Sequence, residues 1–261
     1  MPAADTSASD SRPGRLSAWL MAEIWAWSLA LQASWNPQRM QNLGLMAALA
    51  PWVRHRRLPL PNVRRVCRRH YEYFNTNPYL AGFVVGGLLR LEEENERAGG
   101  RLNRQVAVFR GSVARALASL GDQLIWLGLQ PALLLAACGL AWLGRPWLGL
   151  ALVGAFALGQ LWLRWRGLAV GYRLGLDIVD MLSKPGWHRA IRGCQRASML
   201  LAGTLAGAYL VALAKSPAAG GAAVAWSLGA GAACGYLLHR RLPGELVFLL
   251  GLPLALILAS L

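Results

Sequence analysis

The chain has 261 residues, a formal net charge of +15 from 27 Lys+Arg against 12 Asp+Glu, and a hydrophobic content of 56%. Charged residues make up only 15% of it, whereas soluble domains carry about 25%. This composition excludes an intrinsically disordered chain and argues against a soluble nucleic-acid-binding protein, despite the basic excess. It favours an integral membrane protein with basic cytoplasmic loops. The four cysteines have no CxxC spacing, so we expect no zinc site, disulfide framework or cofactor.

The first part of the chain has short apolar stretches interrupted by charge. Residues 1–15 are polar, and we expect a disordered tail there. Residues 16–120 are predicted to form amphipathic and re-entrant helices. Apolar residues recur near a period of 3.6 over 15–51, which predicts one helix. A basic break over 51–61 and a short arginine-rich helix over 62–74 are predicted to follow.

A turn is predicted at Asn75-Thr76-Asn77-Pro78, because these residue types favour turns. The apolar run over 79–89 that follows is too short to cross a bilayer. We therefore expect a re-entrant or buried helix. The four Glu within 91–97 are predicted to form a solvated helix end.

The last part, residues 121–261, is predicted to be a transmembrane helical region. A spanning helix needs roughly 17–25 residues. Five uncharged runs occur in this region. Two of them, 199–214 and 246–261, have only 16 residues and are open to a second interpretation, a buried or tilted segment that does not cross. If all five runs cross, the Arg-rich cytoplasmic loop 164–196 and the N-terminus share the cytoplasmic side. The uncharged runs are 124–143, 146–163, 199–214, 220–238 and 246–261.

The predicted fold is an all-α integral membrane protein, with amphipathic and re-entrant N-terminal helices followed by about five transmembrane helices. Candidate ligand-binding residues come first from amide and hydroxyl side chains. Gln32 and Asn36 are four apart, on one face of the predicted helix, and amides bind hydroxyls without bringing charge into the membrane. They are equally suited to holding helices together. For Asn75 and Thr76 the alternatives are ligand contact and an N-cap turn, and the turn is favoured.

Asp122 is the most informative charge, since a carboxylate near the bilayer is costly and usually functional. It can bind the hydroxyl groups of a ligand, pair with Arg110 or Arg115, or cap the helix. Trp126, one turn later, can stack on a ligand ring, although an interface anchor is the favoured interpretation. The sequence contains no phosphate loop, catalytic triad or acid–base pair, so no catalytic residue is predicted.

Four segments resemble, in order, the IID membrane subunit of the mannose/fructose/sorbose family of the bacterial sugar phosphotransferase system. The second continues through the apolar run to the Glu cluster at 91–94, and the third includes Pro131. The segments are LQASWNPQRMQNLG at 31–44, RHYEYFNTNP at 69–78, LGDQLIW at 120–126 and GLAVGYRLGLD at 167–177.

The resemblance implies a multi-pass subunit of the bacterial inner membrane that forms, with a IIC subunit, the translocator for mannose-type sugars such as hexoses and amino sugars. Phosphoryl transfer would lie with the IIA and IIB phosphocarrier proteins, and membrane lipids would surround the chain. No phosphorylated histidine is implied, and none of the four histidines has a carboxylate neighbour in the sequence that suggests a nucleophile. The four are therefore interpreted as structural or solvated: His55, His70, His188 and His239.

The chain departs from the family in the segment 108–122, where a Gly/Pro-rich run is replaced by Ala, Leu and Arg. Such a replacement favours a continuous helix. Gln130 stands where the family usually has Arg, and only 215–221 separates the later apolar runs. These departures support an alternative function, a IID-like scaffold or regulatory membrane partner that does not transport sugar.

Overall fold

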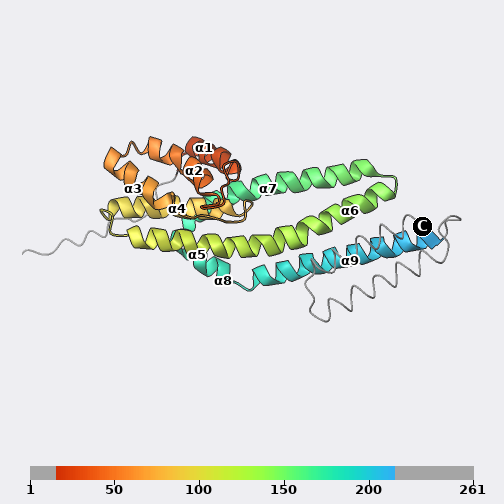
Figure 1. Ribbon diagram of the computed structural model, residues 1–261. Helices are drawn as coiled ribbons and strands as arrows, with labels where there is room; N and C mark the ends of the chain where they lie inside the picture. The colour runs from red at the N-terminus through yellow and green to blue at the C-terminus, as the bar shows by residue number, and fades with distance from the viewer. Residues whose placement is uncertain (1–15, 215–261) are drawn as a thin grey trace, which may run out of the picture. The chain divides into compact units, whose positions relative to one another are not determined.

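The computed structural model describes residues 16–214, and all regular elements in this range are helices (Figure 1). The all-α prediction is therefore confirmed for the described residues. Residues as far as Ser198 belong to one compact unit, whose internal packing is described below. The predicted tail over 1–15 and the predicted spans over 220–238 and 246–261 lie outside the described residues.

The N-terminal part contains three short helices, α1 (Ala18–Leu29), α2 (Asn42–His55) and α3 (Leu60–His70). The single helix predicted over 15–51 is wrong, because the chain leaves the helical path after Leu29 and re-enters it at Asn42. The residues between them, 30–41, form a series of turns held together by the side chain of Asn36.

The basic break predicted over 51–61 is shorter in the structure. Helix α2 continues through Pro51, and the chain turns at Arg57, which has a φ of 49°. Helix α3 contains most of the arginine-rich helix predicted over 62–74 but ends at His70. It ends there because the next residues pair with the 30–41 segment instead of continuing the helical hydrogen bonds.

Helix α4 (Ala81–Arg97) lies between α5 (Asn103–Gly121) and α7 (Pro146–Leu174) and packs on both (Figure 1). All residues from 81 to 89 are buried, which confirms the buried helix predicted for this apolar run. A helix that is apolar all round belongs in a protein interior or a membrane. Here the covering helices include α5 and α7, which follow α4 in the sequence, and α2, which precedes it.

Helices α4 and α7 approach closely enough for their backbones to touch. An added Cβ at Gly86 would lie 2.2 Å from the Leu168 carbonyl oxygen, and one at Gly171 would lie 2.3 Å from that of Phe83. Small residues four apart are the usual means by which membrane helices pack this tightly. The four glycines at the crossing are Gly82 and Gly86 on α4 and Gly167 and Gly171 on α7.

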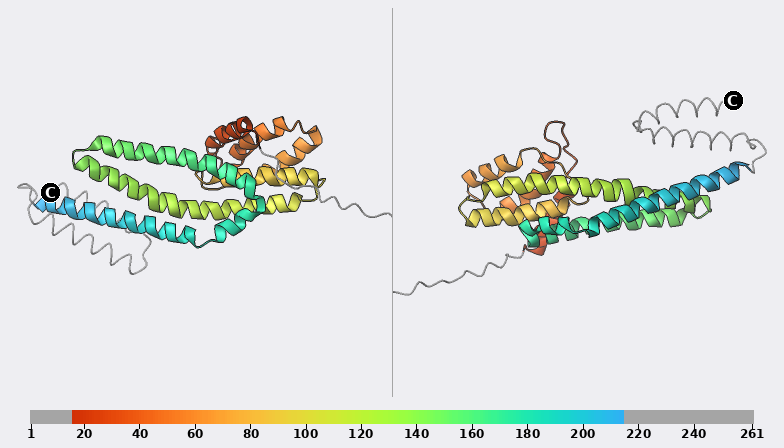
Figure 2. Two further views of the ribbon diagram at one scale, coloured as in Figure 1. Left: turned by 180° about the vertical axis from the view of Figure 1, so that it is seen from behind. Right: turned by 90° about the horizontal axis from the view of Figure 1, so that it is seen from below.

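Helix α5 continues without a break into a π-helix, η1 (Asp122–Leu129), and then into α6 (Gln130–Trp142). A turn at Gly144, with φ 75°, reverses the chain into α7. The α6–α7 hairpin extends beyond helices α1 to α4 (Figure 2). The spans predicted over 124–143 and 146–163 lie in this hairpin.

The hairpin is apolar, and the other described residues leave most of it uncovered. Among residues 16–214, two stretches are long and apolar enough to cross a membrane, Asn103–Trp142 and Pro146–Ser183, whose apolar 18-residue windows have mean hydropathies of 1.9 and 1.5. Only 11% of the most apolar window of each is buried within the protein. Exposing that much contiguous apolar surface to water is unfavourable, so lipid or a partner helix is its natural environment.

The remaining helices described are η2 (Gly175–Asp177), α8 (Ile178–Ser183) and α9 (Gly186–Ala214). The segment 164–196 was expected to be a loop, but it is helical apart from a short break around Lys184 and Pro185. The span predicted over 199–214 forms the last part of α9.

Candidate functional site

Asn36 holds the turn segment 30–41 through all the polar atoms of its amide. Its Oδ1 accepts from the Arg39 backbone N–H at 2.8 Å, and its Nδ2 donates to Asn42 Oδ1 at 3.0 Å. Gln32 is exposed in the same segment, and neither residue lies on a helix. The expectation that Gln32 and Asn36 share one helical face is therefore wrong. Asn36 is committed to local structure, because its donors and acceptor are already used.

The segment 30–41 lies beside the segment 71–80. The backbone N–H of Gln41 donates to the Phe74 carbonyl at 2.8 Å, and a β-bridge joins Met40 to Phe74. The Gln41 side chain bonds the Thr76 backbone twice: its Nε2 donates to the Thr76 carbonyl, and its Oε1 accepts from the Thr76 N–H, both at 3.0 Å. Thr76 is buried, and its hydroxyl has no hydrogen-bond partner in residues 16–214.

The tip of the second segment reaches the long helix at Asp122. Asn77 donates from Nδ2 to Asp122 Oδ1 at 3.0 Å, and its Oδ1 accepts from the Tyr79 N–H. Asn77 also packs directly on Gly121, where an added Cβ would lie 2.4 Å from the Asn77 Cβ. Gly121 thus makes room for the Asn77–Asp122 contact.

Of the three roles considered for Asp122, two are not seen in the structure. No ion pair within residues 16–214 joins Asp122 to Arg110 or Arg115. It does not cap a helix end either, since α5 runs through it into η1. The continuous helix expected over 108–122 is confirmed.

The other side of the tip contacts α7. The ring of Tyr79 packs edge to face with Phe156, with 6.5 Å between centroids, and the Arg164 guanidinium lies 5.2 Å from the Tyr79 centroid. The tip therefore sits as a wedge between the two long helices, bound to one by Asn77 and to the other by Tyr79. We call residues 75–79 the wedge.

The wedge meets the long helix where that helix is irregular. Residues Asp122–Leu129 are π-helical, so each backbone hydrogen bond spans five residues in place of the four of an α-helix. Such insertions are rare and are frequent at functional sites. Trp126 lies in this stretch and is 42% exposed. Asn75 is half-buried at the start of the wedge.

The structure thus brings Asn75, Thr76 and Asp122 to one place, with Asn77 as the residue that joins them. Asn77 was treated only as part of a turn, yet it makes the central contact. One feature of the sequence could have indicated the contact: Asn77 lies in the second family-like segment, 69–78, and Asp122 lies in the third, 120–126. Gln32 and Trp126 are exposed, and Asn36 is engaged in its own segment.

The structure contains a second polar cluster, around Glu92 and Glu93, that the sequence analysis does not predict. Both side chains are buried. Glu93 accepts from Trp52 Nε1 at 3.2 Å and from the Tyr172 hydroxyl at 2.7 Å, so it links α2 and α7 to α4. Glu92 accepts from Arg69 at 2.8 and 3.0 Å. The prediction of a solvated helix end is wrong for these two residues.

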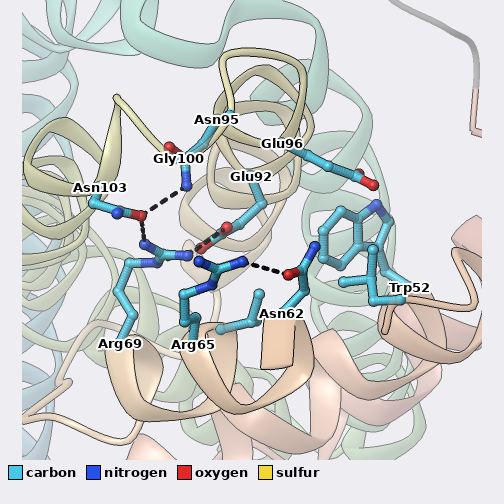
Figure 3. A pocket seen from close by; sticks show the side chains of 12 residues that line it. Trp52, Asn62, Arg65, Arg69, Glu92, Asn95, Glu96, Gly100 and Asn103 are labelled. Atoms are coloured by element: carbon cyan, nitrogen blue, oxygen red, sulfur yellow. Dashed lines mark hydrogen bonds and ion pairs between the residues drawn. The ribbon is translucent and has the colours of Figure 1, made fainter. Parts of the chain in front are cut away.

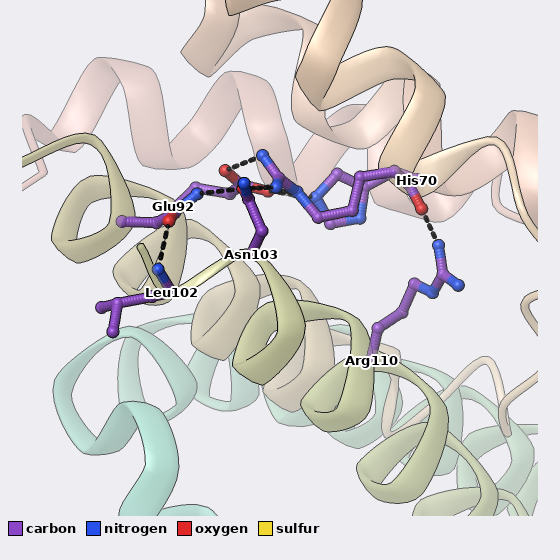
Figure 4. A network of polar contacts seen from close by, with 7 residues as sticks. His70, Glu92, Leu102, Asn103 and Arg110 are labelled. Carbon is purple, nitrogen blue, oxygen red and sulfur yellow. Dashed lines mark hydrogen bonds and ion pairs between the residues drawn. The ribbon is translucent and has the colours of Figure 1, made fainter. Parts of the chain in front are cut away.

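Glu92 also lies 2.6 Å from His70 Nε2, a carboxylate contact that is distant in the sequence and fits the structural role expected for His70 (Figure 4). His70 is fully buried, and burial lowers its pKa. Its Nδ1 has no partner in the described part of the chain, and Arg69 and Arg110 lie nearby. His70 is therefore neutral and donates from Nε2 to Glu92. Being inaccessible, it cannot receive a phosphoryl group without unfolding of its surroundings.

These features define an all-helical integral membrane protein. The described residues leave most of its apolar hairpin uncovered, and their buried polar groups join helices to one another. The described residues include no group of three or more side chains suited to holding a metal ion.

A sequence model of the PTS system mannose/fructose/sorbose family IID component matches residues 16–222. The chain belongs to this family. The mannose-specific EIID component of Escherichia coli K12 is 31% identical over 176 residues, which are 67% of this chain and 62% of that protein. The sorbose-specific EIID component of Lacticaseibacillus casei is 29% identical over 175 residues, with the same two coverages. The matched region thus spans less than two thirds of the length of these relatives.

Two solved structures are similar in fold. One, described as a membrane protein, aligns with a TM-score of 0.67 and 27% identity over 74% of this chain and 71% of that chain. The other is the cryo-EM structure of the mannose transporter ManYZ in complex with microcin E492, with a TM-score of 0.57 and 22% identity. It covers 94% of this chain and 97% of that one, and at this identity the likeness concerns the fold alone.

Proposed function

We propose that this chain is the IID membrane subunit of a phosphoenolpyruvate-dependent sugar phosphotransferase system. With a IIC subunit it forms the translocator for mannose-type sugars in the bacterial inner membrane, with its N-terminus in the cytoplasm. The observation that carries the proposal is the family match over residues 16–222. The contact between Asn77 and Asp122 supports it, because it joins two segments that resemble the family.

The chemistry of phosphoryl transfer is proposed to lie in the IIA and IIB phosphocarriers. The buried, neutral state of His70 agrees with this division, since a phosphohistidine requires an accessible ring nitrogen. The role proposed for this chain is to shape the path and to contact the sugar.

The proposed sugar contact is the region around the wedge, with Asn75, Thr76 and Asp122. Asp122 has a second carboxylate oxygen beyond the one that Asn77 occupies, and carboxylates accept strongly from hydroxyl groups. Trp126 lies one turn further along and is exposed, as a stacking surface must be. Gln32 stays a candidate because it is exposed, whereas the engaged amide of Asn36 favours a structural role.

A second candidate function is a IID-like scaffold or regulatory partner that does not transport. It is favoured by one specific observation, the uninterrupted course of α5 through 108–121 where the family usually has a Gly/Pro-rich run. The π-helix that follows favours the translocator function, because transporters commonly have irregular backbone beside the substrate path and η1 lies next to the wedge.

The deciding experiment measures phosphoenolpyruvate-dependent phosphorylation of mannose in membranes that contain the cognate IIC subunit and soluble carriers, with and without this chain. We expect activity only with the chain present. We expect Asp122→Ala to lower it at least about tenfold, since a hydrogen bond to a charged group contributes about 1.5–3 kcal/mol. The matched control is Asp177→Ala, which removes an exposed carboxylate at the end of η2.

Equal activity with and without the chain would exclude the translocator function. Absence of activity while the chain co-purifies with the IIC subunit would favour the scaffold. If Asp122→Ala and Asp177→Ala behave alike, the sugar contact lies elsewhere even if the chain is required.

A further inference from the structure

A polar pocket of about 130 Å³ lies among α2, α3, α4 and the loop that joins α4 to α5 (Figure 3). Trp52, Leu58 and Val66 form its apolar wall. It shares no lining residue with the wedge or with Asp122. Its polar lining consists of Asn62, Arg65, Arg69, Glu92, Asn95, Glu96 and Asn103, together with Gly99 and Gly100.

Both carboxylates of the pocket are already neutralised. The Arg69 guanidinium donates twice to Glu92, at 2.8 and 3.0 Å, and once to Asn103 Oδ1. Glu96 is bound by Arg56, which donates at 2.7 and 3.2 Å. Each of these two anions therefore has a cation of its own.

Arg65 also lines the pocket, but it is not part of either of these ion pairs. It donates to Asn62 Oδ1, and no carboxylate within residues 16–214 forms an ion pair with it. Arg65 and Arg69 are four apart on α3, and both guanidinium groups face the pocket in Figure 3. Like charges at this spacing repel each other. When Arg56 is counted as the partner of Glu96, the pocket and its ion pairs have one positive charge in excess, on Arg65 beside the Arg69 guanidinium.

The amide of Asn62 extends the same donor set. A guanidinium has donors and no acceptor, so the Asn62 oxygen must face Arg65. The Asn62 nitrogen is then left as a donor, and no hydrogen bond is recorded for it among the described residues. Arg65 also keeps its Nε and Nη1 donors. Free donors on two neighbouring side chains, Arg65 and Asn62, therefore line the pocket beside a positive charge.

We propose that this pocket binds a phosphate-type oxyanion, with Arg65 and Asn62 as its principal ligands and Arg69 providing a second positive charge. A tetrahedral oxyanion accepts from several converging donors at once and pairs with a guanidinium in two-point geometry. The volume suits a compact anion with a few waters, not an extended molecule. A free phosphate ester and a phospholipid headgroup offer the same chemistry. The proposal does not rest on the sugar-transport function.

The test titrates the purified full chain with inorganic phosphate by isothermal titration calorimetry. Parallel arms use a hexose 6-phosphate and nanodiscs with phosphatidylglycerol or with phosphatidylcholine. We expect Arg65→Gln to weaken binding at least about tenfold, because charge-assisted bonds are the strong ones. Arg64→Gln is the matched control: both residues are exposed and the charge change is the same, but Arg64 does not line the pocket. We expect it to weaken binding less than about twofold.

Saturable binding of the soluble phosphates that is lost in Arg65→Gln supports the pocket with a free ligand. Loss confined to the phosphatidylglycerol nanodiscs supports it with a lipid headgroup. Equal weakening by Arg64→Gln and Arg65→Gln would mean a diffuse charge effect and would overturn the proposal, as would no saturable binding in any arm. Asn62→Ala serves as a second variant and is expected to weaken binding without removing a charge. Circular dichroism checks that each variant is folded.

Discussion

Glu92 is a carboxylate whose side chain is only 3% exposed, and it is kept charged by its neighbours. Burial alone would raise its pKa, but the hydrogen bond from His70 and the charge and hydrogen bonds of Arg69 outweigh burial and lower it below 4.5. The pKa of His70 falls below 6.5 for a different reason, since burial disfavours the imidazolium. Both groups resist protonation in the folded protein.

This pair predicts loss of stability in acid. Below pH 6.5 the unfolded chain binds a proton at His70 that the folded chain does not, so the free energy of unfolding falls as pH decreases. The slope from one such group reaches about 1.4 kcal/mol per pH unit. Glu92 adds a further loss only below its ordinary value of 4.5. Stability is therefore greatest at neutral pH.

We expect His70→Gln to flatten the decrease in stability between pH 6.5 and pH 5, because glutamine can still donate to Glu92 but does not titrate. The measurement is the unfolding midpoint of the detergent-purified protein at several pH values. The control is His188→Gln, an exposed histidine on α9, which should leave the slope unchanged. An unaltered slope in His70→Gln would show that His70 is not the titrating group.

At the level of elements, the α4–α7 crossing depends on the absence of side chains. Gly171 and Gly159 lie on the same helix, yet an added Cβ at Gly171 meets the Phe83 carbonyl at 2.3 Å, while one at Gly159 meets nothing within 4 Å. We expect Gly171→Ala to destabilise the protein by about 1–3 kcal/mol through overpacking. Gly159→Ala should be neutral or stabilising by up to about 1 kcal/mol, because alanine favours the helix.

The measurement is the unfolding midpoint of both variants in the same detergent. The two substitutions add the same methyl group to the same helix, so any difference between them reports the contact with α4. Equal midpoints would mean that α7 does not pack on α4 as described.

The hairpin and the buried helix could be predicted from the sequence, because each is defined by a continuous apolar run. The break at 30–41 could not, since Leu31 and Trp35 keep the helical period while the Asn36 amide takes over the backbone hydrogen bonds. The spacing of apolar residues does not show that a side chain competes for backbone hydrogen bonds. The helix predicted from that spacing is therefore too long.

The candidate site shows the same limit at longer range. Asp122 could be singled out as a carboxylate near an apolar run, but its partner Asn77 lies 45 residues away in the sequence. Glu93 was assigned to solvent because its neighbours in the sequence are charged, whereas its partners Trp52 and Tyr172 lie on other helices. Composition indicates that a polar group is present, and only the fold decides whether it is satisfied by water or by protein.

At the level of the whole molecule, charge and apolar surface occupy opposite ends of the unit formed by residues as far as Ser198. The arginines of α3 and of the α4–α5 loop lie away from the hairpin turn at 143–145, which contains one arginine. About 20 residues separate Asp122 from that turn, roughly the 30 Å needed to cross a bilayer. Basic segments are retained on the cytoplasmic side. We therefore propose that the arginine-rich end faces the cytoplasm and that the hairpin turn reaches the other side.

Cysteine labelling tests this orientation. In a chain whose native cysteines are replaced, we expect an impermeant maleimide to label Arg101→Cys only in inside-out vesicles and Leu143→Cys only from outside intact cells. Both positions are exposed, Leu143 at 77%, so labelling reports the side of the membrane and not burial. Labelling of both from one side would mean that the hairpin does not cross. The reverse pattern would place the arginines outside, against the charge rule.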